Sequence, residues 1–168
     1  MGTNWSHNFE SSLSINSCGE VLVSAGDGGA VRFFPTNDGK LVPDLGYHAT
    51  LERNDADHSF DFFSKDGTRY HYKFINEHLQ WMVDLIEDRN GNTLTMTYDM
   101  QALPEPRLVS VLALDGREFK FNYLEQTVLV PGASARQPFL SQVTGPGGMS
   151  MDFKHDPFGN LTEVNRSG

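Results

Sequence analysis

The sequence DRNGNTLTMTYD, residues 88–99, combines a glycine turn with a strict alternation of apolar and polar residues. Leu94, Met96 and Tyr98 follow Gly91 at three, five and seven residues, and threonines separate them. Alternation with a period of two is typical of a strand with one buried face. These residues therefore predict a turn that leads into a half-buried strand.

The same phrase recurs with drift along the chain. It returns as DGGAVRFFP (27–35), DGTRYHYKF (66–74), LDGREFKFNY (114–123) and GGMSMDFKHDPFGNL (147–161). The turn glycines at 67, 91, 116 and 148 are 24, 25 and 32 residues apart. A period of this length indicates stacked supersecondary units, each in contact mainly with its neighbours.

An apolar pair also precedes most of these turns, eight and five residues before the glycine: Val83 and Ile86, Leu108 and Val111, Leu140 and Val143. Around the first pair, Leu79, Met82, Val83 and Ile86 match the stripe of an amphipathic helix. Their place in the array favours a strand, preceded by a helical turn at most. The Asn-Gly and Asp-Gly dipeptides at 90–91 and 115–116 are typical of tight primed turns between antiparallel strands. The predicted fold class is therefore all-β, built from antiparallel β-hairpin repeats.

Composition bounds the function classes. The length of 168 residues predicts one domain, and the net charge of −9 argues against nucleic acid as a partner. No run approaches the roughly 20 apolar residues of a membrane span, so no membrane insertion is expected. The first residues show no secretory signal, and the single Cys18 excludes an internal disulfide.

No constellation of catalytic, cofactor-binding or metal-binding residues emerges, and we expect no enzyme activity and no cofactor. The six histidines show no ligand spacing and no pairing with a carboxylate, and His71 is expected on the outer face of its strand. The acidic residues Glu52, Asp55, Asp57 and Asp61 lack the spacing of an EF-hand loop. The aromatic rows fit a core better than a sugar-stacking platform.

DRNGNTLTMTYD, LVSVLALDGREFKFNY (108–123) and DPFGNLTEV (156–164) resemble successive repeats of the RHS and YD-repeat family, named after a Tyr-Asp pair such as Tyr98-Asp99. NWSHNFESSLSI (4–15), GDGGAVRFF (26–34) and SKDGTRYHYKF (64–74) are similar to the module that precedes those repeats. The chain departs from the pattern where Leu124 follows Tyr123 and where His155 precedes Asp156. The structural repeat positions are Gly67, Gly91, Asn92, Tyr98, Asp99, Gly116, Arg117, Phe121, Tyr123, Gly148, Phe153, Gly159 and Asn160.

The resemblance implies a curved strip of hairpins, with an N-terminal β module over 1–78 continuous with YD-type repeats over 79–168. It also implies a non-catalytic wall segment of a shell that encloses a C-terminal toxin domain. The expected partners are that toxin cargo and further repeats of the same polypeptide, and the isolated chain is expected to pair edge to edge with itself. The protein would be cytoplasmic before export and then secreted or delivered to a cell surface. The alternative is an extracellular β-repeat module that binds glycans or a protein partner.

Overall fold

The computed structural model describes residues 9–26, 28–76, 80–102, 106–130 and 133–168. Within them the chain forms antiparallel strands and a single three-residue 3-10 helix, η1 (Pro146–Gly148), which confirms the predicted all-β antiparallel class. The strands are β1 (Ser12–Ile15), β2 (Val21–Ser24), β3 (Ala30–Pro35), β4 (Leu41–Pro43), β5 (Thr50–Asn54), β6 (Ser59–Phe63), β7 (Arg69–Asn76), β8 (Gln80–Glu87), β9 (Thr93–Asp99), β10 (Arg107–Ala113), β11 (Glu118–Val130), β12 (Ala133–Thr144), β13 (Ser150–His155) and β14 (Leu161–Ser167).

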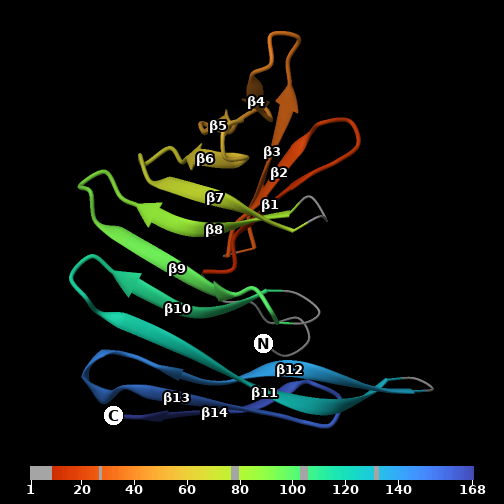
Figure 1. Cartoon of the computed structure of the whole chain (residues 1–168), viewed down its shortest axis with the longest axis vertical. Helices are drawn as coiled ribbons and strands as arrows, with labels where there is room; N and C mark the ends of the chain where they lie inside the picture. Colours follow the sequence, from red (N-terminus) through yellow and green to blue (C-terminus); the bar gives the residue numbers. More distant parts are fainter. Residues whose placement is uncertain (1–8, 27, 77–79, 103–105, 131–132) are drawn as a thin grey trace.

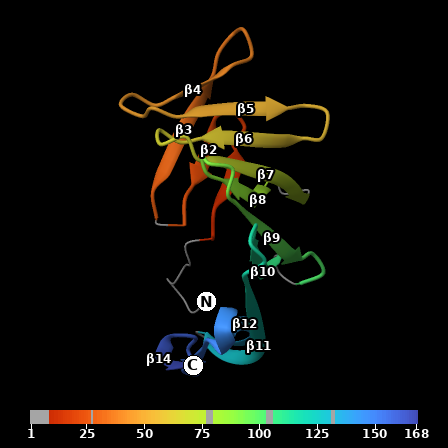
Figure 2. The same ribbon diagram turned by 90° about the vertical axis from the view of Figure 1, so that its left-hand side faces the viewer.

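Each strand pairs with the next one along the chain, and β1 also pairs with β8. This second pairing closes β1 to β8 into a ring, from which β9 to β14 continue as an open sheet (Figures 1 and 2). The closure differs from the expected strip, in which each unit contacts only its neighbours. The closure arises because two partners share the edge of β8 that faces away from β7. Gln80–Met82 pairs with β1, and Leu85–Glu87 pairs with β9.

The buried face of the strands forms one continuous apolar cluster. Phe33, Phe60 and Tyr72 are at most 1% exposed and fill the ring, while Met96, Val111 and Phe121 continue the cluster under the open sheet. The rings of Phe60 and Trp81 meet edge to face at 5.3 Å, a favourable geometry for two aromatic quadrupoles. In β9, Thr95 and Thr97 alternate with the apolar residues and are exposed, as the sequence pattern predicts.

The glycine turns at 67, 91, 116 and 159 share one geometry, which is not the expected primed type. In the turn from Asp88 to Asn92, the Gly91 amide donates to the Asp88 carbonyl (3.0 Å) and the Asp88 amide donates to the Asn92 carbonyl (3.0 Å). Only Gly91 has a positive φ (81°), whereas a type I′ turn needs positive φ at both central residues. The loop is therefore a type I turn followed by a left-handed glycine that forms a G1 bulge. The interpretation of Asn90-Gly91 as a primed turn is wrong.

A β-bulge occupies the same place in four strands and explains the apolar pairs before the turns. The pairing skips one residue directly after Val83, Leu108, Leu140 and Leu161. An extra residue resets the alternation, so that Val83 and Ile86 face the core although they are three residues apart. The bulge therefore imitates a helical stripe in a segment that the structure shows as strand β8, as predicted. Leu79, at the place of the expected helical turn, lies outside the described residues.

Candidate functional site

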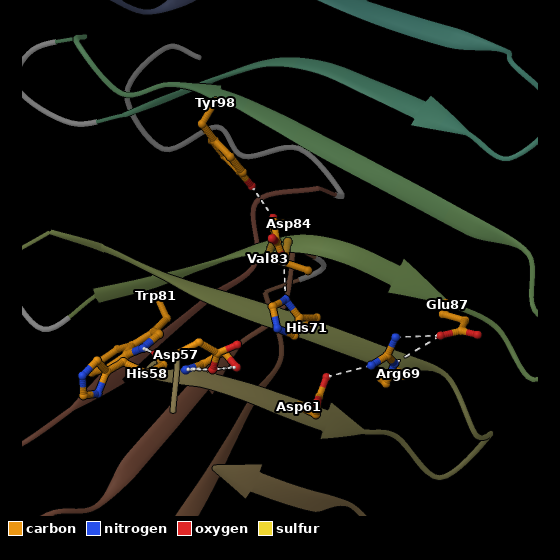
Figure 3. Close-up of polar contacts among 11 residues, drawn as sticks. Asp57, His58, Asp61, Arg69, His71, Trp81, Val83, Asp84, Glu87 and Tyr98 are labelled. Atoms are coloured by element: carbon orange, nitrogen blue, oxygen red, sulfur yellow. Dashed lines mark hydrogen bonds and ion pairs between the residues drawn. The ribbon is translucent and has the colours of Figure 1, made fainter. Parts of the chain in front are cut away.

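Two tyrosines of the repeats bind backbone carbonyls at these bulges. The Tyr98 hydroxyl donates to the Val83 carbonyl at 2.8 Å (Figure 3), and the Tyr123 hydroxyl donates to the Leu108 carbonyl at 3.0 Å. Both contacts span fifteen residues, and both carbonyls directly precede the bulged residue. A bulge disrupts the ladder locally, and the hydroxyl gives the carbonyl beside it a hydrogen-bond partner.

Burial disfavours the ionised form of both tyrosine side chains. It raises the pKa of Tyr123 to about 12 and raises the pKa of Tyr98 further, with a smaller contribution from the Asp84 carboxylate. Both residues therefore act as neutral hydrogen-bond donors across the physiological pH range. This is a structural role in the sheet.

The repeat that begins at Leu140 has no such tyrosine contact. His155 lies fifteen residues after Leu140, the place that tyrosine holds in the two preceding repeats. Its ring packs against Phe139 with 4.8 Å between centroids. Desolvation by burial lowers the pKa of His155 and favours the neutral imidazole. The substitution noted in the sequence thus replaces a hydroxyl contact with ring packing.

Tyr72 belongs to a third contact, inside the ring. Its hydroxyl donates to Ser11 Oγ at 2.7 Å, and Ser11 Oγ in turn donates to the Ser24 carbonyl at 2.9 Å. These two hydrogen bonds join β7 to the residue before β1 and to the end of β2, beside the pairing of β1 with β8. Burial raises the pKa of Tyr72 to about 12.

A cluster of charged residues covers the polar face of β6 to β8 (Figure 3). Arg69 lies between two carboxylates, with Nη2 at 2.8 Å from Glu87 Oε2 and Nη1 at 3.3 Å from Asp61 Oδ1. About a third of the Arg69 side chain is exposed, so each pair contributes at most about 1 kcal/mol. The two ion pairs link β7 to its neighbours β6 and β8.

His71 corrects one prediction, because it does pair with a carboxylate. Its Nδ1 lies 2.5 Å from Asp84 Oδ1, and both side chains are partly buried. The sequence did not reveal the pair because Asp84 is the bulged residue of β8 and has no partner in the regular register with β7. Among the residues that the structure describes, no three histidine, cysteine or acidic side chains gather closely enough to hold a metal ion.

The acidic residues of β5, β6 and the turn between them do not converge on one point. Asp55 pairs with Arg53 at 2.5 Å, Glu52 is exposed on its strand, and Asp61 belongs to the Arg69 cluster. The Ser59 hydroxyl and amide donate to the Asp57 carboxylate, and the hydroxyl contributes most to the lowered pKa of Asp57. Cys18, His48 and His58 are exposed, and His7 and His78 lie outside the described residues.

The remaining repeat positions lie mainly in turns. The glycines at 67, 91, 116, 148 and 159 have φ between 81° and 86°. Asn92 and Asn160 end two matching turns, in which their side-chain amides donate to Asp88 and Asp156 at 2.8 and 3.0 Å. Arg117 pairs with Asp115 at 2.7 Å, Asp99 is exposed at the end of β9, and Phe153 packs against the core.

The turn at Gly148 and the expected boundary between residues 78 and 79 need separate description. Gly148 belongs to η1, where Gly147 has a positive φ as well, so this turn differs from the others. The expected boundary between residues 78 and 79 falls outside the described residues, between two strands that pair with each other.

Comparison with models of protein families finds no match, and a search of curated proteins also finds none. No helix in the described part of the chain is long and apolar enough to cross a membrane.

Proposed function

We propose that the chain is a non-catalytic wall segment of an RHS-type shell, which encloses a toxin domain from the C-terminal part of the same polypeptide. The observation that carries the proposal is the sequential order of the strands from β1 to β14, all antiparallel. A sheet that grows by one hairpin at a time can be extended without rearranging the hairpins already made.

The repeated local geometry supports the same role. The turn from Asp88 to Asn92 and the turn from Asp156 to Asn160 make the same set of hydrogen bonds. The hydroxyl contacts of Tyr98 and Tyr123 also match in position. Recurrence of one turn, one bulge and one tyrosine contact is what a stack of equivalent units requires.

The proposed partners are the toxin cargo and further repeats of the same polypeptide, which would pair with the outer edge of β14. The proposed location is outside the producing cell or on a target surface, after synthesis in the cytoplasm. In isolation, the β14 edge offers unpaired amides and carbonyls to a second copy, since exposed edges template strand pairing.

The alternative function, binding of glycans or a protein partner, has its support in exposed aromatic residues. Tyr47 and Phe158 are 50% and 63% exposed on separate loops. Binding to a glycan array that is lost in Tyr47→Ala or Phe158→Ala would favour this alternative over the wall.

The decisive experiment uses the polypeptide that carries the cargo. Deleting residues 92–122 removes β9, β10 and the start of β11, and should make the cargo domain accessible to protease without changing its intrinsic activity. Tyr47→Phe, which changes an exposed side chain, serves as the control and should leave the cargo protected. A cargo that stays fully protected after the deletion would refute the wall function. So would inhibition of separately purified cargo by the deleted shell.

The edge can be tested on the present chain. Val164→Lys adds a charge to β14, and should reduce self-association in sedimentation velocity experiments, because lysine on an edge strand blocks pairing. Thr95→Lys is the matched control, since Thr95 is exposed on β9 between two paired strands. Equal self-association of the two variants would contradict edge pairing through β14.

A further inference from the structure

One end of the β1–β8 ring contains a pocket that the wall function does not use. Its volume is about 380 Å³, and Ile15, Arg53, His58, Phe74 and Trp81 line it. They come from β1, β5, the turn after β5, β7 and β8, so the pocket spans the ring from one side to the other. An eight-stranded closed sheet has room inside for packed side chains or one small ligand, and the mouths of such sheets are frequent ligand sites.

The alternation of the strands explains why these side chains meet. Ile15 follows the buried Leu13 by two residues on β1, and Phe74 follows the buried Tyr72 by two residues on β7. Arg53 stands opposite the buried Phe60 in the β5–β6 pairing. Residues with this spacing or pairing share a face, so the inner rows of the ring continue past the core into the pocket.

The wall around Trp81 is held in place before any ligand arrives. The Trp81 ring meets Phe60 at 5.3 Å and Phe74 at 5.2 Å, and its Nε1 donates to the His58 carbonyl at 2.6 Å. Figure 3 shows His58 beside the Trp81 ring. His58 has a φ of 56°, the only positive value among the described residues other than glycine. A strained backbone held by its surroundings is a feature that clusters at ligand sites.

The charge of the lining selects the ligand. Arg53 and His58 are the only lining residues that can carry charge, and both are basic in a chain of net charge −9. Arg53 contacts Asp55 at 2.5 Å, yet 56% of its side chain remains exposed and can face a second anion. Phe74 is 37% exposed and offers an apolar surface in the same pocket.

We propose that this pocket binds a small carboxylate with a flat apolar body, of the size of a phenyl or indole ring. The body would pack between Phe74, Ile15 and the edge of Trp81, and the carboxylate would accept hydrogen bonds from the Arg53 guanidinium. The Trp81 indole N–H is already bonded to His58 and plays no part in recognition. The inference is independent of the wall function, since neither requires the other.

Fluorescence of Trp81 tests the proposal directly. The chain has two tryptophans, so Trp5→Phe leaves Trp81 as the sole reporter. Phenylacetate and indole-3-acetate should change its emission in a saturable way. We expect dissociation constants on the order of 1 mM, an affinity that lies within the limit for a ligand of about ten heavy atoms. The uncharged 2-phenylethanol should bind at least tenfold more weakly.

Matched variants separate the site from nonspecific effects. Arg53→Gln should weaken phenylacetate at least tenfold and leave 2-phenylethanol unchanged, whereas Arg32→Gln, on an exposed position of β3, should change neither. Phe74→Ala should weaken both probes, and equal thermal midpoints would show that these variants remain folded. No saturable change with either carboxylate up to about 10 mM, or an unchanged affinity in Arg53→Gln, would overturn the proposal.

Discussion

Replacing Tyr98 by phenylalanine removes one hydroxyl and keeps the ring. The hydroxyl donates to the Val83 carbonyl at 2.8 Å, beside the bulge of β8. A neutral hydrogen bond contributes about 1 kcal/mol, and a partly buried acceptor left without its partner raises the cost to about 2 kcal/mol. Tyr98→Phe should therefore lower the free energy of unfolding by about 1 to 2 kcal/mol, and Tyr123→Phe should have a similar effect through the Leu108 carbonyl.

Urea denaturation followed by circular dichroism measures the change. With a slope of roughly 2 kcal/mol per molar urea, the midpoint should fall by about 0.5 to 1 M in each variant. Tyr47→Phe is the control, because Tyr47 is half exposed and its change should stay within about 0.5 kcal/mol. Midpoints of Tyr98→Phe and Tyr123→Phe that match this control would refute the capping role.

The repeat that begins at Leu140 offers the reverse experiment. His155→Tyr restores a hydroxyl fifteen residues after Leu140 and should raise the free energy of unfolding by about 1 kcal/mol. A fall in stability would show that the packing of His155 on Phe139 matters more than the missing hydroxyl.

Three further predictions concern pH, turns and metals. Burial raises the pKa of Tyr72 and Tyr123 to about 12, above the unfolded value of about 10. The free energy of unfolding should therefore be constant below pH 10 and decline as the pH rises toward 12. Urea midpoints measured between pH 8 and 11 would show this decline, and flat midpoints would contradict it. Gly91→Ala should lower the free energy of unfolding by about 1 to 2 kcal/mol through its positive φ alone. Gly159→Ala should lower it further, because its Cβ would also stand 3.0 Å from the Phe139 ring. Equal losses in thermal unfolding would argue against this steric contribution. Dialysis against a chelator should leave the melting temperature unchanged, whereas a fall that calcium or zinc reverses would indicate a metal site.

Much of the fold follows from local sequence. The alternation after Gly91 and Gly116 predicts strands whose buried side includes Met96 and Phe121, and the structure has both. These patterns report directly on geometry, because side chains of a strand alternate between two faces whatever lies beyond them. The glycines likewise mark turns that need a positive φ, although the turn type depends on hydrogen bonds that the dipeptide does not specify.

The bulges show where local reasoning stops. The spacing of Val83 and Ile86 could be read as a helix or as an irregular strand, and only the pairing of β8 with β7 distinguishes the two. The pairing of His71 with Asp84 was missed for the same reason, since it depends on where the extra residue falls. A bulge is a property of two strands together, so neither strand alone reveals it.

Local sequence therefore predicts the alternating strands after the glycine turns, their buried faces and the positions of those turns, because period-two alternation and glycine conformations are properties of short segments. The pairing of β1 with β8, which closes the ring and brings Ile15, Arg53 and Trp81 to one pocket, follows only from the folded chain. Ile15 and Trp81 are 66 residues apart in the chain. Their meeting depends on the accumulated twist and register of all the strands between them, which no local pattern records.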